Sequence, residues 1–237
     1  MRGKIDTSVT PILIPFKHES KRCPMKNYAL FDATVRWLRD EGVDGGVYVV
    51  SKAWSALNFA RMRGQALGFD IRVIEESERS ESDISACYFA ARALGAAQYF
   101  EMPLSSPIRE RGLLERMLDR LDAEPELDFV TTFQHMADRG IFALTDYDGK
   151  FERFEVDARE RKGALCKDKR YVDGAAYLIR PSFLYHMDGP GRPGDNELFW
   201  SGRFATVENC VPFLIDVDTD IDYGRAAIVG KAIGRPL

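Results

Sequence analysis

The stretch "VTPILIPFKHESKRCPMKNYALFDATVRWLRDEGVDGGVYVVS", from Val9 to Ser51, decides the fold. Residues 9–16 are an apolar run of strand length, and residues 28–42 repeat apolar positions at helical spacing up to a closing glycine. Residues 45–51 return to a short run rich in valine. A buried strand, an amphipathic helix and a second buried strand predict a βαβ unit, in which the two strands run parallel.

The same alternation continues toward the middle of the chain. It predicts strands at residues 71–74, 97–102 and 128–134, and helices at residues 55–68, 82–95 and 109–121. Ser82 is placed to cap the helix that follows it. The order predicts an α/β fold with a mainly parallel sheet and helices on both faces. In such sheets ligands bind beyond the carboxyl ends of the strands, where the loop after residue 16 is expected to lie.

The second half follows a different pattern. Residues 140–156 alternate apolar and polar positions around Asp148-Gly149, which predicts a β-hairpin, and a basic excursion follows at residues 158–170. Two further strands are expected at residues 171–181 and 211–218, and a last helix at residues 221–233. We predict a single domain, residues 1–237, with a hairpin insertion at about 140–170.

Composition narrows the class of protein. The formal net charge of -4 gives no reason to expect nucleic acid as a partner. No apolar run approaches the ~18 residues of a membrane span, and the polar N-terminus lacks the apolar core of a signal peptide. Four widely spaced cysteines argue against a zinc site and against a disulfide framework. We therefore expect a cytoplasmic protein that binds neither nucleic acid nor a membrane.

The loop after the first strand concentrates positive charge. Four basic residues occur within ten positions: Lys17, Lys21, Arg22 and Lys26. The loop has neither the P-loop pattern nor the dinucleotide fingerprint, so its lysines, Ser20 and backbone N–H groups are what it offers to a phosphate. A solvated turn rich in lysine is an equally good interpretation of these residues alone.

A cluster of acids near the C-terminus, "LIDVDTDID", offers a metal site. If residues 211–218 form a strand, Asp216 and Asp218 project to the same side, because side chains two apart share a face. Paired carboxylates at a strand end suit Mg²⁺ together with the phosphates of a substrate. Asp220 and Asp222 have a structural interpretation instead, since Thr219 and Asp222 fit a capping box at the start of a helix.

Two further motifs hint at a ligand. In "PLSSPIRERG" (Pro103 to Gly112), capping explains the serines, but Arg109 in a first helical turn opposes the helix dipole and favours an anionic or hydroxylated ligand. Gly174 lies inside a predicted strand, which indicates either a bulge or the close approach of a ligand. A strand that simply packs Tyr177 and Ile179 explains this motif equally well.

These motifs occur in an order that resembles the cytidylyltransferases that activate acidic nine-carbon or eight-carbon sugars, especially the CMP-N-acylneuraminate (CMP-sialic acid) synthetase branch. The family loop A-R-x-G/N-S-K-x-x-P-x-K-N is similar to "FKHESKRCPMKN", which matches at Ser20, Lys21, Pro24, Lys26 and Asn27. The family turn T-S-P-L-R looks like residues 105–109, and the element S-x-D/S-D-x-x-S looks like Ser82, Asp83 and Ser85. The strand Y-x-x-N-G-A-x-Y and the terminus D-I-D-T-x-x-D are matched at Tyr171, Asp173, Gly174, Ala175, Tyr177, Asp216, Val217, Asp218, Thr219 and Asp222.

The resemblance implies a Rossmann-like nucleotidyltransferase fold with a dimerisation hairpin, a homodimer, CTP as nucleotide and Mg²⁺ as cofactor. The implied reaction moves CMP from CTP to a hydroxyl of an acidic sugar, with release of pyrophosphate. The catalytic residues would be Lys21, Asp216 and Asp218, the two aspartates being the metal ligands. Nucleotide binding would fall to Pro15, Phe16, Lys17, Ser20, Lys26, Asn27, Ser82 and Asp83. The acceptor would contact Arg109, Ser106, Gly174 and Tyr177.

Several positions depart from the family pattern. Lys17 stands in the place of the loop arginine and loses its planar fork. The other departures are Glu19, Arg22, Lys52, Ala53, Glu76 and Pro103, the last where the family has a glutamine associated with sugar contact. A changed acceptor is our leading explanation, and a non-catalytic nucleotide-binding homologue is the second. RNA binding through residues 17–26 and 159–170 is a third, against which the net charge counts.

Overall fold

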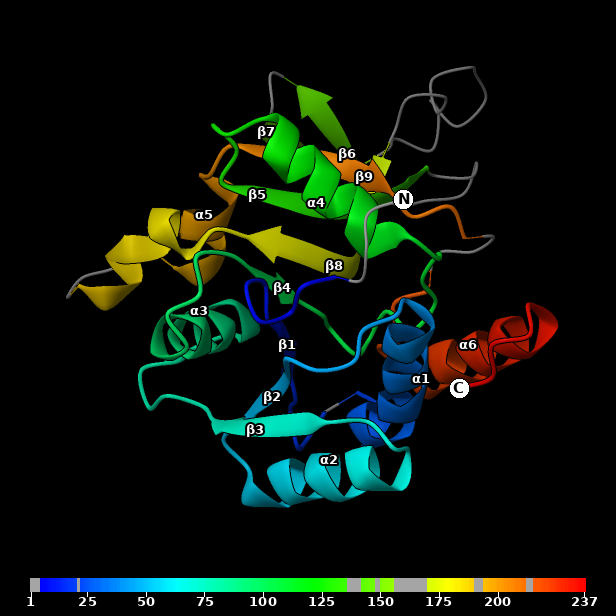
Figure 1. Cartoon of the computed structure of the whole chain (residues 1–237). Coiled ribbons are helices and arrows are strands. Elements are labelled where there is room, and N and C mark those ends of the chain that lie inside the picture. The colour runs from blue at the N-terminus through cyan, green and yellow to red at the C-terminus, as the bar shows by residue number, and fades with distance from the viewer. Residues whose placement is uncertain are drawn as a thin grey trace, which may run out of the picture.

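The computed structural model describes residues 5–20, 22–135, 142–147, 150–155, 170–189, 194–211 and 215–237; at residues 135, 142–147, 150–155, 170 and 171 it describes the backbone alone. Strands and helices alternate through the first half of the chain, as predicted (Figure 1). The strands there are β1 (Ile12–Pro15), β2 (Val47–Ser51), β3 (Ile71–Glu75), β4 (Tyr99–Glu101) and β5 (Phe129–His135). The helices between them are α1 (Lys26–Asp40), α2 (Trp54–Ala66), α3 (Asp83–Ala93) and α4 (Leu113–Ala123).

The sheet has the order β3-β2-β1-β4-β8-β5-β9. Strands β3, β2, β1 and β4 are parallel, whereas β8 (Arg170–Ile179) lies antiparallel between β4 and β5. Strand β9 (Phe204–Glu208) runs parallel to β5 at the edge. Strands β6 (Phe142–Tyr147) and β7 (Lys150–Glu155) form the predicted hairpin, which pairs with β8. Its turn at Asp148-Gly149 and most of the predicted insertion lie outside the described residues.

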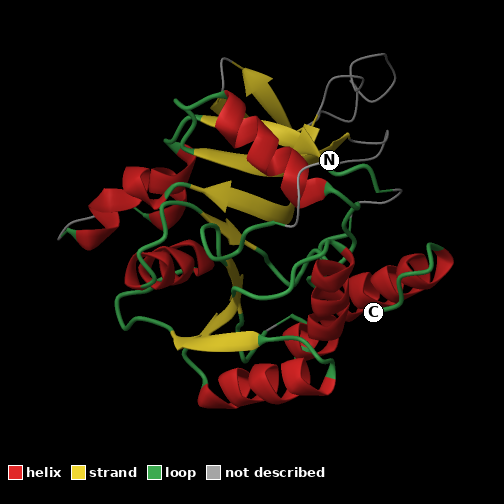
Figure 2. Cartoon of the chain, viewed as in Figure 1, coloured by secondary structure: helices red, strands yellow, loops and turns green. Residues whose placement is uncertain are grey.

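Two apolar clusters pack on opposite faces of this sheet. Along β1, Ile12 and Ile14 belong to the cluster covered by α1, α2 and α4, whereas Leu13 belongs to the cluster covered by α3, η3 (Pro181–Asp188) and α5 (Asp195–Trp200). This division follows from the two-residue alternation of a strand buried on both faces. Helices therefore cover both sides of the sheet, as Figure 2 shows, and the predicted fold class is confirmed.

The helix caps predicted at Ser82 and Thr219 are confirmed. Ser82 caps α3 and exchanges hydrogen bonds with Ser85, and Thr219 does the same with Asp222 at the start of α6 (Asp220–Ala232). The start of α4 differs from the prediction, because the helix begins at Leu113 after Gly112, whose φ is 72°. Arg109 therefore lies in the irregular segment before the helix, so the argument from the helix dipole does not apply to it.

The end of the sheet also differs from the prediction. Strand β9 was not expected, and residues 215–218 form no strand although residues 211–218 were predicted as one. Instead, the N–H of Val217 donates to the carbonyl of Ser105 at 2.8 Å, and the Val217 side chain is fully buried. This segment crosses the loop after β4 rather than extending the sheet. Among the described residues, no helix is both long enough and apolar enough to span a bilayer.

Candidate functional site

The basic loop and the C-terminal acids meet at the start of α1. Lys26, the first residue of α1, donates from Nζ to the Val217 carbonyl at 2.6 Å and to Asp218 Oδ1 at 3.2 Å. Arg22 approaches the other carboxylate oxygen of Asp218 at 2.8 Å. Lys21 lies outside the described residues. Two segments from the two ends of the chain thus form one charged junction.

Asp216 and Asp218 flank a buried valine and both reach solvent. Asp216 accepts a hydrogen bond from the side chain of Ser105. Burial of the Asp216 carboxyl, opposed by this bond and reinforced by the charge of Asp218, raises its pKa. The residue as a whole is exposed, so this desolvation is partial and carries little energy. Because the charge of Asp218 acts on Asp216, a cation between or beside the two carboxylates would be favoured.

The donor set fits Mg²⁺ with help from a substrate. The described part of the chain has no group of three or more His, Cys, Asp or Glu side chains arranged to hold a metal. Magnesium needs no such cage, because one or two carboxylates, waters and substrate phosphates usually complete its coordination. Asp216 and Asp218 would be the protein ligands.

Other nucleotide-binding candidates shape the loop itself. Ser20 Oγ accepts from the N–H of Cys23 at 3.3 Å, and the Asn27 amide donates to the carbonyl of Lys17 at 2.9 Å. Pro15 and Phe16 are buried at the end of β1, and the Phe16 carbonyl accepts from Ser51 Oγ at 2.6 Å. These contacts fix the path by which the chain leaves the sheet.

Lys17 and Asp83 form an ion pair between two neighbouring cavities. Their charged atoms lie 3.0 Å apart, with Asp83 in the first turn of α3. The first, here called the Lys52 cavity, has a volume of about 310 Å³ and is lined by Phe16, Lys17, Lys52, Glu76, Ser82 and Asp83 among others. The second, here called the Glu101 cavity, is also about 310 Å³, and Lys17, Asp83, Glu101, Pro103, Tyr177 and Trp200 contribute to its lining.

Five of the seven departures from the family pattern line the Lys52 cavity, namely Lys17, Glu19, Lys52, Ala53 and Glu76. Lys52 Nζ donates to the Ser80 carbonyl at 3.0 Å and lies 3.6 Å from a carboxylate oxygen of Glu76. Partial burial raises the pKa of Glu76, while the charge of Lys52 opposes that shift. A lysine–glutamate pair therefore occupies the positions where the family has a serine-threonine-aspartate motif and an arginine.

Arg109 is placed differently from the prediction. Its side chain is fully buried, and the guanidinium donates to the carbonyls of Ala175 at 2.8 Å and Pro103 at 2.5 Å. A third contact reaches Thr34 Oγ1 at 3.2 Å, and the ring of Trp37 lies beneath the guanidinium carbon. Burial lowers the pKa of Arg109 to about 9. The expectation that Arg109 faces an acceptor is corrected: it binds backbone inside the protein.

Gly174 marks a bulge. Its φ is +63°, and the pairing of β5 with β8 shifts register beside it. A Cβ at this position would meet Ser106 Oγ at 3.4 Å, and Ser106 in turn donates to the Asp173 carbonyl at 2.7 Å. Ser106 and Gly174 thus pack against one another, and Tyr177, another predicted acceptor contact, lines the Glu101 cavity.

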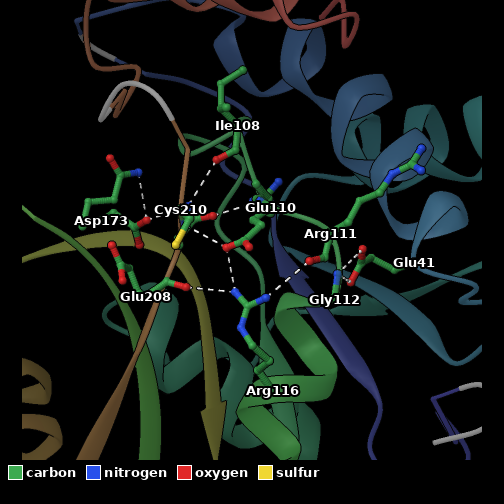
Figure 3. Close-up of polar contacts among 12 residues, drawn as sticks. Glu41, Ile108, Glu110, Arg111, Gly112, Arg116, Asp173, Glu208 and Cys210 are labelled. Carbon is green, nitrogen blue, oxygen red and sulfur yellow. Dashed lines mark hydrogen bonds and ion pairs between the residues drawn. The ribbon is translucent and has the colours of Figure 1, made fainter. Parts of the chain in front are cut away.

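A buried polar network supports the segment between β4 and α4. Asp173 accepts hydrogen bonds from Thr132, Gln134, the N–H of Ala175 and Asn209. The side-chain oxygen of Asn209 also accepts a hydrogen bond from the N–H of Glu110 at 2.9 Å. The carboxylate of Glu110 in turn accepts a hydrogen bond from the Arg116 guanidinium at 2.7 Å (Figure 3). At the far end, both oxygens of Glu41 accept from the N–H of Gly112. Nearly every polar group here has a partner, so the segment that carries Ser105 and Arg109 is held rigidly.

Sequence reasoning missed Glu101. This last residue of β4 is 3% exposed, and its Oε2 has no hydrogen-bond partner although it lines the Glu101 cavity. Burial and the charge of Asp83 raise the pKa of Glu101 to about 8, against an opposing contribution from Lys17. The available signal was an acid between Phe100 and Met102 in the run "AQYFEM", whose other polar residue is Gln98.

Comparisons with known proteins agree on the fold. No protein-family model matches the sequence. No curated protein matches it either. Among solved structures, CMP:2-keto-3-deoxy-manno-octonic acid synthetase complexed with CTP superposes with a TM-score of 0.66 at 14% identity, covering 95% of this chain and 98% of the other. HddC from Yersinia pseudotuberculosis superposes with a TM-score of 0.66 at 15% identity, covering 94% of this chain and 99% of the other. A cytidylyltransferase from Leptospira borgpetersenii superposes with a TM-score of 0.60 at 15% identity, covering 93% of this chain and 86% of the other.

These similarities establish the fold class. The chain has the Rossmann-like nucleotidyltransferase fold, a mixed sheet with helices on both sides. One of the proteins that share it is a cytidylyltransferase by name, and another is a CMP-sugar acid synthetase whose structure contains CTP. Identities this low do not transfer an activity, because one fold hosts many functions.

Proposed function

We propose that the protein transfers CMP from CTP to a hydroxyl group of a sugar-like acceptor and releases pyrophosphate. The observation that carries this proposal is that Lys26 and Arg22 both contact the carboxylate of Asp218. These contacts bring the basic loop and the acidic pair together at one place. Positive side chains beside paired carboxylates are what a metal–triphosphate complex requires. The order of the five family motifs along the chain supports the same reading.

In this proposal the protein positions reactants and neutralises charge. Lys17 and Lys26 would exchange their carboxylate partners for phosphate oxygens, with Lys21 as a further cation from the same loop. Asp216 and Asp218 would hold Mg²⁺, which when bound neutralises the triphosphate and lowers the pKa of the attacking hydroxyl. Ser82 and Asp83 would contact the nucleotide from the start of α3. Asn27 and Ser20 would keep the loop in shape.

The acceptor would occupy the Glu101 cavity, next to Lys17. The family resemblance makes acidic 2-keto sugars the first acceptors to test. The buried Arg109 cannot meet their carboxylate without leaving Ala175 and Pro103, so it acts as a positioning residue. A homodimer joined through the β6–β7 hairpin belongs to the same proposal, and analytical ultracentrifugation tests it.

The deciding experiment measures pyrophosphate release from CTP and Mg²⁺ with a panel of sugar acids, amino sugars and neutral sugars. Turnover with any of them supports the proposal. CTP binding without turnover across the panel favours the non-catalytic homologue, for which the paired state of Lys17 and the Lys52–Glu76 pair are the structural arguments. If CTP does not bind at all, both readings fail.

A variant pair tests the metal ligands. Asp218→Ala should abolish metal-dependent turnover while circular dichroism shows an intact fold, because the carboxylate is partly exposed and lies outside the sheet. Asp70→Ala, which removes an exposed acid directly before β3, is the matched control and should keep full turnover. Unchanged turnover in Asp218→Ala would contradict the metal assignment.

A further inference from the structure

The Glu101 cavity is lined by a buried carboxyl group, that of Glu101, with an oxygen that has no hydrogen-bond partner. Glu101 is 3% exposed, and Oε2 lacks a hydrogen-bond partner. Leaving a buried polar group unpaired costs free energy, and more when the group is charged. Such a group calls for an explanation, and a ligand that completes it is one. Because Glu101 lines a cavity of about 310 Å³, a ligand in that cavity can reach it.

The sheet directs Glu101 toward this cavity. In the register of the strands, Glu101 lies between Leu13 of β1 and Tyr177 of β8. Leu13 and Tyr177 both pack with the cluster on the α3 and α5 side of the sheet. Neighbouring positions across paired strands share a face, so the Glu101 side chain points to the same side. The first turn of α3 and the end of α5 close the cavity there.

Three aromatic rings form another wall. Phe199 packs edge-on against Tyr177 at 5.7 Å and against Trp200 at 5.2 Å between ring centroids. All three residues line the cavity. Aromatic faces attract organic cations, most strongly where water is excluded. A carboxyl group beside aromatic rings is the combination that recognises an ammonium group.

The charges on the cavity wall point the same way. Within the described part of the chain, its charged lining residues are two acids, Asp83 and Glu101, and one base, Lys17. Lys17 is already paired with Asp83, whereas the Glu101 carboxyl has an oxygen without a hydrogen-bond partner. The guanidinium of Arg109 donates to the carbonyl of Pro103, which is a cavity residue, and to that of Ala175.

We propose that the Glu101 cavity binds the cationic nitrogen of an amine-bearing acceptor, such as an amino sugar, through Glu101 and the rings of Tyr177, Phe199 and Trp200. That the bound amine is an acceptor rests on the proposed function, but binding of an amine in the Glu101 cavity can be tested without that function. Glu101 is the specificity-determining group: when the ammonium binds, the Glu101 carboxyl releases its proton to solvent and accepts a charge-assisted hydrogen bond from the ammonium, and the reacting hydroxyl is left to the neighbouring nucleotide.

The test is equilibrium binding in the absence of CTP and metal. Glucosamine, galactosamine and mannosamine are titrated against glucose, galactose and mannose, and binding to the full chain is followed by NMR. At least one amino sugar should bind roughly ten-fold or more tightly than its parent sugar, as expected from a hydrogen bond to a charged group. If no amino sugar is preferred over its parent, the proposal is overturned.

Two variants assign the preference to one side chain. Glu101→Gln keeps the shape of the residue and should abolish the preference for the amine. Glu75→Gln is the matched control, because Glu75 is the last residue of β3 as Glu101 is of β4, and it is exposed away from the cavity. It should retain the wild-type preference. A preference that survives in Glu101→Gln overturns the assignment.

A second measurement separates this site from the metal. Binding of CTP and the Mg²⁺ concentration at half-maximal CTP binding should be the same in Glu101→Gln as in the wild type. A shift in the Mg²⁺ requirement would make Glu101 a metal ligand and overturn the proposal. If the wild type fails to bind CTP, the proposed transferase function fails, and the amine preference is judged by the titrations alone.

Discussion

Lys26 and Asp218 lie 192 residues apart in the sequence, yet the Nζ of Lys26 is 3.2 Å from Oδ1 of Asp218. The Lys26 side chain is only 13% exposed, which shields the pair from water and salt more than an ordinary surface pair. The same ammonium also bonds the Val217 carbonyl. One lysine therefore anchors the C-terminal segment to the start of α1 and places the acidic pair beside the basic loop.

Replacing Lys26 should affect stability and nucleotide binding together. Lys26→Met removes two hydrogen bonds and should lower the free energy of unfolding by ~1–3 kcal/mol. It should also weaken CTP binding, because a phosphate partner is lost. Denaturant unfolding and CTP titration measure the two effects. Lys231→Met, in the exposed last turn of α6, is the control and should change neither.

Gly174 provides a test of the bulge. Gly174→Ala places a Cβ on a residue with φ of +63° and 3.4 Å from Ser106 Oγ. We expect a loss of stability of ~1–2 kcal/mol from the left-handed conformation alone. Gly45→Ala, at a position where an added Cβ meets no atom within 4 Å, should be close to neutral or stabilising. Equal stabilities of the two variants would contradict the bulge as a source of constraint.

Arg109 separates a positioning role from direct acceptor contact. Arg109→Met leaves the Ala175 and Pro103 carbonyls without their buried donor and should destabilise the protein by ~1–3 kcal/mol per unpaired group. The folded fraction should lose kcat with little change in the acceptor KM, because the residue holds a loop and touches no substrate. A selective rise in acceptor KM at unchanged stability would show that Arg109 reaches the acceptor after all.

Glu101 should make stability depend on pH. Its folded pKa is raised to about 8 from an ordinary 4.5, so between these values the folded protein holds a proton that the unfolded chain releases. The contribution to stability is complete below about 4.5 and is lost as pH rises through about 8. Stability of the wild type relative to Glu101→Gln should fall across this window, by up to ~1.4 kcal/mol per pH unit. Melting temperatures at pH 5, 6.5 and 8 give the readout, and a constant difference between the two proteins would contradict the shift.

The first half of the fold could be predicted because its signals are local. Strand and helix periods alternate from residue 9 to residue 134, and the caps at Ser82 and Thr219 depend on residues only three positions away. Strand β9, five residues long, was not predicted; it begins soon after helix α5 ends. Residues 215–218 look like a strand, but a hydrogen bond from Val217 to Ser105 holds them against another loop.

The part of the candidate site that could be predicted is the part that the order of the sequence motifs indicates. The sequence identified the basic loop and the acidic pair, and the structure brings Lys26 and Asp218 together. Whether Arg109 points into a cavity or into the core depends on tertiary packing, and no pattern around "SSPIR" distinguishes these cases. Glu101 stands in a strand among apolar residues, and only the cavity beside it distinguishes an unsatisfied carboxyl from an ordinary edge position.

Lys17 belongs to the walls of both cavities, and its ion pair with Asp83 lies where they adjoin. A triphosphate that draws the Lys17 ammonium away leaves Asp83 and Glu101 without a nearby cation, so the second cavity then holds a positively charged ligand more strongly. By linkage, that ligand strengthens triphosphate binding by the same factor. The sequence in which two substrates arrive, and their mutual dependence, would then be governed by the breaking of a single ion pair.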